Sequence, residues 1–471
     1  MLIKHGTIQS ILSVPNFQIE ELMTEYLVED LGDLYVSPGL VDINLHAGED
    51  GLSSVTKAAA LGGVTCVATS NSITSSLYCD VAPLGFVSQD DCAFGFKTHL
   101  LKDSLKRVQE VLKTKPVLVF PEYPEQVTEV QSPIKEANCE NSESDDESTD
   151  RYSDLSFENF AISDFFTGPQ ATPKNDRRGS APVITLPKFA TDRKVSFPRM
   201  PRHSVFCTLN MPVLPVPRQD VPFIEKAGIS EESYYQHLEN FPAEFEVAAV
   251  QKLLPCSGKV HFSNVSSALT VETIQKFKPS CEVTFEVSLP YLYFCDRDLK
   301  PCDTRYKIVP PIRNYDNYLS LWELFKDKQI DCVGSYHQPV SPLKKFRANY
   351  HENDNGMSCI GFTLQGVWTK LRSQIMPEED DNYLVYLSEV LSKKPSEILG
   401  LKHKGSIKVG NDADLVVWDP YFKFTVEKTN DKHPNMNVFK GEELYGAVYR
   451  TYVRGQLVQS SPVGCVLNSD N

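Results

Sequence analysis

The chain has 471 residues, of which 41% are hydrophobic and 23% charged, and these values are typical of a soluble globular protein. A formal net charge of −15 disfavours a nucleic-acid or anionic-membrane partner, and no apolar stretch approaches the roughly 18 residues of a membrane-spanning helix. The 12 cysteines are scattered singly and the first residues lack the apolar core of a signal peptide, so we expect reduced thiols and a cytoplasmic location.

Short apolar stretches typical of buried strands recur along the chain. They are, in order, residues 63–70, 115–122, 258–266, 281–289 and 330–335. Between several of them lie stretches predicted to be helical, such as 103–114 and 267–278. Strands that alternate with helices form parallel βα units, and this many units favour a TIM-like (β/α)8 barrel over an open sheet.

The two ends of the chain are instead rich in β-forming residues. "AVYRTYVRGQLV", residues 447–458, alternates with the period of two that is typical of a strand. We therefore predict that the ends meet in a small β-sandwich beside the barrel. The predicted division is 1–36 and 405–460 for the sandwich, 37–125 and 204–404 for the barrel, and 461–471 for a tail.

Residues 126–203 interrupt the barrel pattern. The first part, which contains "EANCENSESDDESTD", is acidic and serine-rich, and the second part is basic and punctuated by proline. The segment has few large aliphatic side chains and cannot bury enough apolar surface to offset the conformational entropy lost on ordering. We therefore predict a disordered insertion.

The insertion contains two similar short motifs, "RRGSAP" and "RKVSFP". Each places an arginine three residues before a serine, Ser180 or Ser196, and a proline two residues after it. This spacing resembles a basophilic-kinase site whose phosphorylated form binds a 14-3-3-type reader. The acidic stretch "SESDDESTD" resembles an acidophilic-kinase target. The alternative is a solvated linker with serines at random positions.

Several phrases, in order along the chain, resemble the cyclic amidohydrolases, and within that family the allantoinases. They include "VSPGLVDINLHAGEDG", "GFK", "VHFSNVSSALTVETI", "YKIVPPIR", "SYHQP" and "KGSIKVGNDADLVVWDP". The resemblance covers nearly the whole chain except the insertion. It implies a TIM barrel with a split β-sandwich and two divalent metal ions at the carboxyl ends of the strands, where a bridging hydroxide opens a cyclic amide. It also implies a carboxylate that serves as general base.

The resemblance implies that four of the six metal-ligand positions are altered. The family's paired histidines fall on Asn44 and His46, its carbamylated lysine on Lys97, two further histidines on Phe120 and Asn264, and its aspartate base on Tyr336. Asparagine offers only a neutral amide oxygen, phenylalanine offers no donor atom, and a phenol is a poor ligand. His46 and Lys97 are then vestigial, and His337, beside Tyr336, is kept.

We interpret the chain as a catalytically inactive member of the family with a regulatory or scaffolding role and no metal cofactor. The alternative is an active hydrolase of a cyclic amide or ureide in purine catabolism, with zinc or another divalent ion in a rearranged or single-metal site. His46, His99 and His337 are the candidate ligands of such a site. A third hypothesis is a sensor whose emptied pocket, lined by residues 70–72 and 310–313, binds a purine-derived ligand.

The barrel wall has a second predicted departure from the family. The strand-like stretches 63–70, 77–82 and 93–99 follow one another closely, whereas parallel strands normally need a crossover of about a dozen residues. Two outer helices are therefore expected to be shortened or missing. The part of the barrel wall that these helices would cover is then an apolar patch that a partner protein can bind. Alternatively, the insertion or another subunit of a homo-oligomer covers this patch. Pairing with an active relative is a further expectation.

Overall fold

The computed structural model describes residues 1–12, 26–73, 76–86, 96–99, 117–120, 232–256, 258–300, 303–347, 349–459 and 461–467. All of them belong to one compact unit formed by residues 1–130 and 217–471. The predicted helix 103–114 and the predicted insertion 126–203, with Ser180 and Ser196, lie outside the described residues. Of the helices in the described ranges, none has both the length and the apolar character needed to cross a bilayer.

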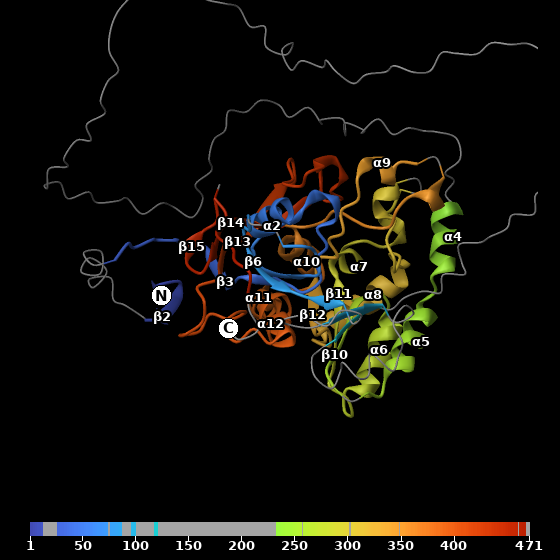
Figure 1. Cartoon of the computed structure of the whole chain (residues 1–471), viewed down its shortest axis with the longest axis horizontal. Helices are drawn as coiled ribbons and strands as arrows, with labels where there is room; N and C mark the ends of the chain where they lie inside the picture. Colours follow the sequence, from blue (N-terminus) through green and yellow to red (C-terminus); the bar gives the residue numbers. More distant parts are fainter. Residues whose placement is uncertain are drawn as a thin grey trace, which may run out of the picture. The chain divides into compact units, whose positions relative to one another are not determined.

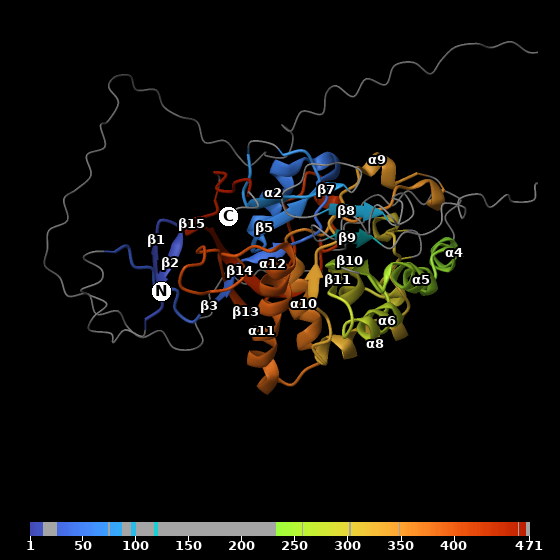
Figure 2. The same cartoon turned by 60° about the horizontal axis from the view of Figure 1, so that its bottom comes forward.

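Two parallel sheets form the wall that the alternating pattern predicts. The three-stranded sheet contains β4 (Leu40–Asp42), β5 (Val64–Thr69) and β6 (Asp80–Pro83). The six-stranded sheet contains β7 (Gly85–Phe86), β8 (Phe96–His99), β9 (Val117–Phe120), β10 (Val260–Val265), β11 (Val283–Ser288) and β12 (Cys332–Gly334). Figure 2 shows β8 to β11 side by side in chain order, as in a βα barrel.

The two sheets are continuous at one side of the wall. Only Leu84 separates β6 from β7, so a single extended segment pairs first with β5 and then with β8. At the other side, the backbone N–H of His46, after β4, donates to the carbonyl of His337, after β12, at 3.0 Å. No ladder joins β4 to β12 within the described ranges, so the wall is that of the predicted barrel but its closure is not established.

Helices cover the outer side of β10 and β11. Helices α5 (Ala243–Leu253), α6 (Ala268–Phe277) and α8 (Tyr315–Lys326) lie together beside these strands (Figure 1). Along each strand apolar and polar residues alternate, and residues two apart point to the same face. Phe262 and Phe285 pack with Ile274 of α6 in the main core. The alternate positions, which include Glu286, therefore face the inside of the wall.

The remaining α-helices follow the strands or fill the ends of the wall. They are α2 (Leu52–Leu61), α4 (Glu232–Asn240), α7 (Leu289–Tyr293), α9 (Pro342–Lys345), α10 (Thr363–Arg372), α11 (Asp380–Ser388) and α12 (Lys394–Leu399). Between β5 and β6, the described residues of 70–79 contain no helix, in line with the short spacing in the sequence. The second short connection, before β8, lies outside the described residues.

The segment after β15 lies against the edge of β6. Val466 forms a parallel bridge with Val81, and the Val81 N–H donates to the Cys465 carbonyl at 2.9 Å. Gly464 passes so close to the backbone that an added Cβ would lie 2.0 Å from the Cys79 carbonyl oxygen. Residues 461–467 thus pair with the edge of β6.

The two ends of the chain contribute to one antiparallel sheet. Its order is β15 (Gln456–Leu457), β14 (Glu443–Val453), β13 (Leu415–Thr425) and β3 (Tyr35–Pro38). A hairpin of β1 (Leu2–Lys4) and β2 (Thr7–Ser10) lies beside this sheet in Figure 1. The Ile8 N–H donates to the Asn411 carbonyl and the Ile8 carbonyl accepts from the Gly410 N–H, both at 2.9 Å, and these bonds attach the hairpin to the segment that leads into β13.

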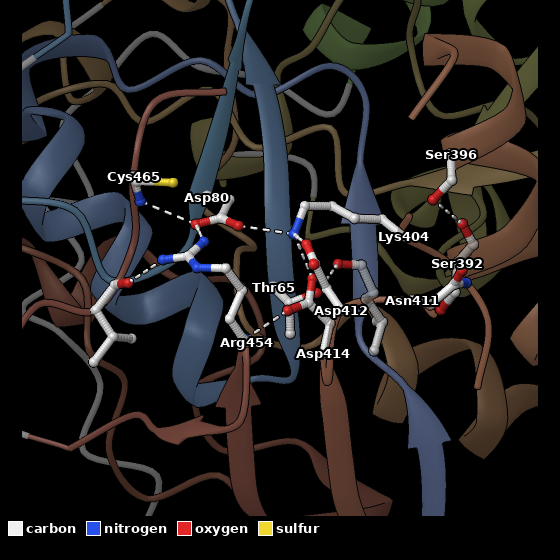
Figure 3. Close-up of polar contacts among 12 residues, drawn as sticks. Thr65, Asp80, Ser392, Ser396, Lys404, Asn411, Asp412, Asp414, Arg454 and Cys465 are labelled. Carbon is white, nitrogen blue, oxygen red and sulfur yellow. Dashed lines mark hydrogen bonds and ion pairs between the residues drawn. The ribbon is translucent and has the colours of Figure 1, made fainter. Parts of the chain in front are cut away.

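A buried ionic cluster connects this sheet to the barrel wall (Figure 3). The Lys404 ammonium lies 2.7 Å from Asp80 of β6, 2.9 Å from Asp412 and 2.7 Å from Asp414. Arg454, just after β14, also pairs with Asp80. Burial opposes the charge of Lys404, but the carboxylates of Asp414 and Asp80 outweigh it and raise the pKa of the ammonium.

Candidate functional site

Two asparagines that stand at expected metal-ligand positions bind to each other. The side-chain amide of Asn44, which follows β4, donates to Oδ1 of Asn264 on β10 at 3.2 Å. The same amide group lies 3.4 Å from Oε1 of Glu286, and the Ser288 hydroxyl donates to Asn264 Oδ1 at 2.8 Å. Asn44 is only 2% exposed. At the two positions where the resemblance expects imidazoles, the side chains are thus amides that belong to a hydrogen-bonded network with Glu286 and Ser288.

Glu286 was not identified from the sequence, although it is central to this network. Its carboxylate is fully buried on β11 and accepts from the backbone N–H of Asn264 at 3.3 Å. Gly334 on β12 makes room for it, since a Cβ there would lie 2.7 Å from Oε2. The signal was present in "VTFEVS", where Thr284, Glu286 and Ser288 alternate with apolar residues and so share the inner face.

Tyr336 uses its hydroxyl to hold the backbone. The phenol donates to the Val309 carbonyl at 2.8 Å and accepts from the Val309 N–H at 3.1 Å. Burial raises the pKa of this phenol well above its ordinary value, so the group stays protonated and does not serve as a base. Its backbone φ is +62°, a conformation that aspartate, the family's residue here, adopts more readily than tyrosine.

The hydrogen bonds of His337 select a tautomer that cannot bind a metal through Nε2. Nδ1 accepts hydrogen bonds from the backbone N–H groups of Cys359 and Ile360, both at 3.2 Å. Burial lowers the pKa of His337 to about 4, so the ring is neutral near pH 7. A neutral ring that accepts at Nδ1 carries its proton on Nε2 and has no lone pair there for a metal. This geometry argues against the predicted three-histidine site.

The other members of the predicted site are placed by their backbones. His46 is partly buried beside His337, with which it shares the backbone hydrogen bond described above. Lys97 and His99 lie on β8, where they are in register with Leu118 and Phe120 of β9. The side chains of β8 and β9 are outside the described atoms, so the structure does not test whether Lys97 or His99 reaches the network.

The residues proposed to line a retained ligand pocket have internal roles. Arg313 pairs with Glu246 at 2.8 Å and donates to the Ser266 hydroxyl at 3.0 Å. Asn71 accepts hydrogen bonds from the Ala47 N–H at 2.9 Å and from the Thr69 hydroxyl at 2.8 Å. Both side chains stabilise loops at the carboxyl ends of the strands, which weakens the argument for a purine-derived ligand.

The described residues do not fit the pair of metal ions that the resemblance implies. Asn44 and Asn264 are bonded to each other, and the Tyr336 phenol is bonded to Val309. A pair of divalent ions needs several anionic or imidazole donors directed to one point, together with a carboxylate that accepts the water proton. We therefore derive no catalytic step through such a pair.

Comparison with known proteins agrees with the architecture. The amidohydrolase family model matches residues 363–458, which include α10 and the strands β13 to β15. The chain is 33% identical over 248 residues to the protein named allantoinase from Arabidopsis thaliana, covering 48% of this chain and 47% of that one. It is 26% identical over 469 residues to a probable allantoinase of Oryza sativa subsp. japonica, covering 92% and 79%.

The fold is also that of solved relatives. The D-hydantoinase (dihydropyrimidinase) from Thermus sp. superimposes with a TM-score of 0.66 at 17% identity, covering 99% of this chain and 94% of that one. The matched segment spans about half the length of the Arabidopsis relative. The chain is thus similar in sequence to allantoinases and similar in fold to a hydantoinase, and residues 363–458 match the amidohydrolase family model.

Proposed function

We propose that this chain is a non-catalytic member of the allantoinase-like amidohydrolases that serves as a regulatory or scaffolding protein. The observation that carries the proposal is the hydrogen bond between Asn44 and Asn264. Two positions expected to bind metal instead satisfy each other, with Glu286 and Ser288 completing the network. Two amides bonded to each other do not supply the imidazole donors that a pair of metal ions requires for hydrolysis.

The loss of the general base supports the same conclusion. Opening a cyclic amide requires a group that takes a proton from water and returns it to the leaving nitrogen. Tyr336 stands where the resemblance places that group, and its proton is engaged with the Val309 carbonyl. A phenol with a raised pKa does not accept a proton from water near neutral pH.

Regulation is proposed to act through the insertion. Phosphorylation of Ser180 and Ser196 would add charge that an arginine-lined 14-3-3-type reader binds, and the basic residues around them favour a basophilic kinase. The barrel would then act as the folded body that a partner, an active relative or a second copy of the chain engages.

The first test is an activity measurement on the full chain. Protein produced with zinc, manganese, iron or cobalt is incubated with allantoin and the formation of allantoate is followed, with an active allantoinase as positive control. We expect no turnover above that of the His46→Ala and Lys97→Ala variants. Turnover by the unmodified chain that these variants abolish would overturn the proposal and favour the rearranged metal-dependent hydrolase.

The second test concerns the insertion. The chain is phosphorylated in vitro by a basophilic kinase, and binding to a purified 14-3-3 protein is measured by calorimetry. We expect binding that is lost in a Ser180→Ala, Ser196→Ala double variant and kept in Ser163→Ala, because Ser163 lacks an arginine three residues before it. Equal binding by the double variant, or none by the phosphorylated chain, would refute the regulatory part of the proposal.

A further inference from the structure

Three side chains of types that bind metals meet inside the barrel wall, at residues other than those that the family resemblance assigns to ligands, and one of them, Glu286, also contacts Asn44 and Asn264. His261 lies on β10, Glu286 on β11 and Cys332 on β12. One ring nitrogen, one carboxylate oxygen and the thiol sulfur of these residues lie within 4.8 Å of one another. None of the three side chains is more than 1% exposed.

The strand register explains why the three residues converge. His261 is opposite Thr284 on β11, and Glu286 is opposite Cys332 on β12. Thr284 and Glu286 are two residues apart and therefore share the inner face of β11. The three donors come from neighbouring strands of a hydrogen-bonded sheet, which holds them at fixed separation.

The imidazole of His261 points to a ligand. Its Nδ1 lies 2.9 Å from the Thr284 hydroxyl, and its Nε2 is buried without a hydrogen-bond partner among the described residues. When Nδ1 donates to that hydroxyl, Nε2 carries a lone pair, which is the arrangement of metal-binding histidines. Burial lowers the pKa of His261 to about 3, so the ring is neutral under ordinary conditions.

A second cluster of acidic residues shows what an already satisfied site looks like. Asp80, Asp412 and Asp414 also lie close enough to share an ion, but Lys404 Nζ stands between them and contacts all three (Figure 3). The ammonium supplies the positive charge that a cation would bring, so this cluster needs no metal. The cluster around His261 differs because the ring Nε2 has no hydrogen-bond partner among the described residues.

We propose that His261, Glu286 and Cys332 bind one divalent cation of the zinc class, at a position displaced from that of the ancestral metal pair. Imidazole, carboxylate and thiolate together are a donor set that suits zinc, and they leave a fourth coordination position for water or a neighbouring oxygen. Coordination displaces the thiol proton of Cys332 to solvent. The site stands whether or not the chain has any hydrolytic activity.

The test uses metal content and a spectroscopic signature. The full chain is produced in medium containing cobalt in place of zinc, and bound cobalt is measured by elemental mass spectrometry. We expect near-stoichiometric cobalt with a thiolate-to-cobalt charge-transfer absorption. In Cys332→Ser the charge-transfer band should vanish, and in His261→Ala the cobalt content should fall to about a tenth or less. Cys359→Ser and His237→Ala, buried residues outside the cluster, serve as matched controls.

The thiolate-to-cobalt band of the unmodified chain tests the proposal by itself, so the test does not depend on whether a variant folds. No bound cobalt in that chain would overturn the proposal. Cobalt without a thiolate band, removed by His46→Ala, would also overturn it, and would place the ion at the position expected for an active hydrolase. The proposed absence of allantoin turnover is measured separately and can fail independently.

Discussion

Replacing Tyr336 by phenylalanine tests whether the residue at the expected base position now has a structural role. The phenol makes two hydrogen bonds to Val309, at 2.8 Å and 3.1 Å, and the side chain is 4% exposed. Phenylalanine keeps the ring but leaves a buried N–H and a buried C=O without their partner. Each such loss costs about 1–3 kcal/mol, so we expect the free energy of unfolding to fall by about 2–6 kcal/mol.

The matched control is Tyr291→Phe. Tyr291 is also a buried tyrosine, it packs edge-on against Tyr336, and its hydroxyl donates to the Pro310 carbonyl at 3.0 Å. Because one backbone group instead of two loses its partner, the expected cost is about half as large, near 1–3 kcal/mol.

Restoring the family's residue, Tyr336→Asp, should cost more than Tyr336→Phe. Aspartate adopts a φ of +62° more readily, but it is too short to reach Val309 and it places a carboxylate in a buried site. Burial raises the folded-state pKa above the unfolded value, so the penalty begins above about pH 4 and grows as the pH rises. Relative to Tyr336→Phe, the aspartate variant should therefore lose stability between pH 4 and pH 7.

Urea denaturation of the full-length variants, followed by tryptophan fluorescence, provides the measurement, since Trp322, Trp368 and Trp418 are all buried. A Tyr336→Phe variant within about 0.5 kcal/mol of the unmodified chain would refute the structural role. If such a variant also abolished a measurable hydrolase activity, the tyrosine would belong to the chemistry instead.

Three further predictions concern groups outside this residue. Lys404→Met leaves Asp414 buried without the ammonium, while Asp80 keeps its pair with Arg454. Urea denaturation should show that the free energy of unfolding falls by about 3–5 kcal/mol, and that the loss is smaller at pH 5 than at pH 7. Asn44→Ala removes the amide that donates to Asn264 and Glu286, so the free energy of unfolding should fall by about 1–3 kcal/mol. We expect no allantoin turnover in this variant. Burial lowers the pKa of His237 to about 4, so the unfolded chain takes up its proton first as the pH falls below about 6.5. Stability should therefore decrease between pH 6.5 and 4, and His237→Phe should reduce that slope by one proton; an unchanged slope would contradict the assignment.

The regular elements could be predicted from the sequence because their signals are local. The strands predicted at 63–70, 258–266 and 281–289 correspond to β5, β10 and β11, and the helix predicted at 267–278 corresponds to α6. Burial on both faces of parallel strands produces continuous apolar runs, and these runs mark the strands without any knowledge of the fold. The short interval before β6 likewise indicated a connection without a helix.

The ionic cluster could not be predicted in this way. Lys404 and Asp80 are 324 positions apart in the sequence, and neither lies in a charge pattern that distinguishes it from a surface residue. Their pairing arises only when the segment before β13 packs against the edge of β6. The position of residues 461–467 along that edge has the same origin, since a short apolar tail carries no signal for its partner strand.

The positions of the candidate site come from the family resemblance, whereas the hydrogen bonds between its side chains appear only in the structure. The family resemblance identified Asn44, Asn264 and Tyr336 as altered ligand positions, and they do lie at the ends of β4, β10 and β12. Their partners depend on backbone conformations that a residue pattern does not specify: φ is +59° at Asn264 and +62° at Tyr336. Glu286 was missed because carboxylates were sought only at positions where the family has a ligand.

These bonds have a consequence for any attempt to restore a catalyst. Changing Asn44 and Asn264 back to histidine removes the amide contact between them, and changing Tyr336 to aspartate leaves Val309 without its partner. Until metal ions bind, the restored donors would be buried polar groups with unsatisfied hydrogen-bonding capacity, each costing about 1–3 kcal/mol. Restoring only some of the four altered positions therefore lowers the free energy of unfolding without providing a complete ligand set. Each restored residue therefore has to displace a side chain that is already hydrogen-bonded in the present network.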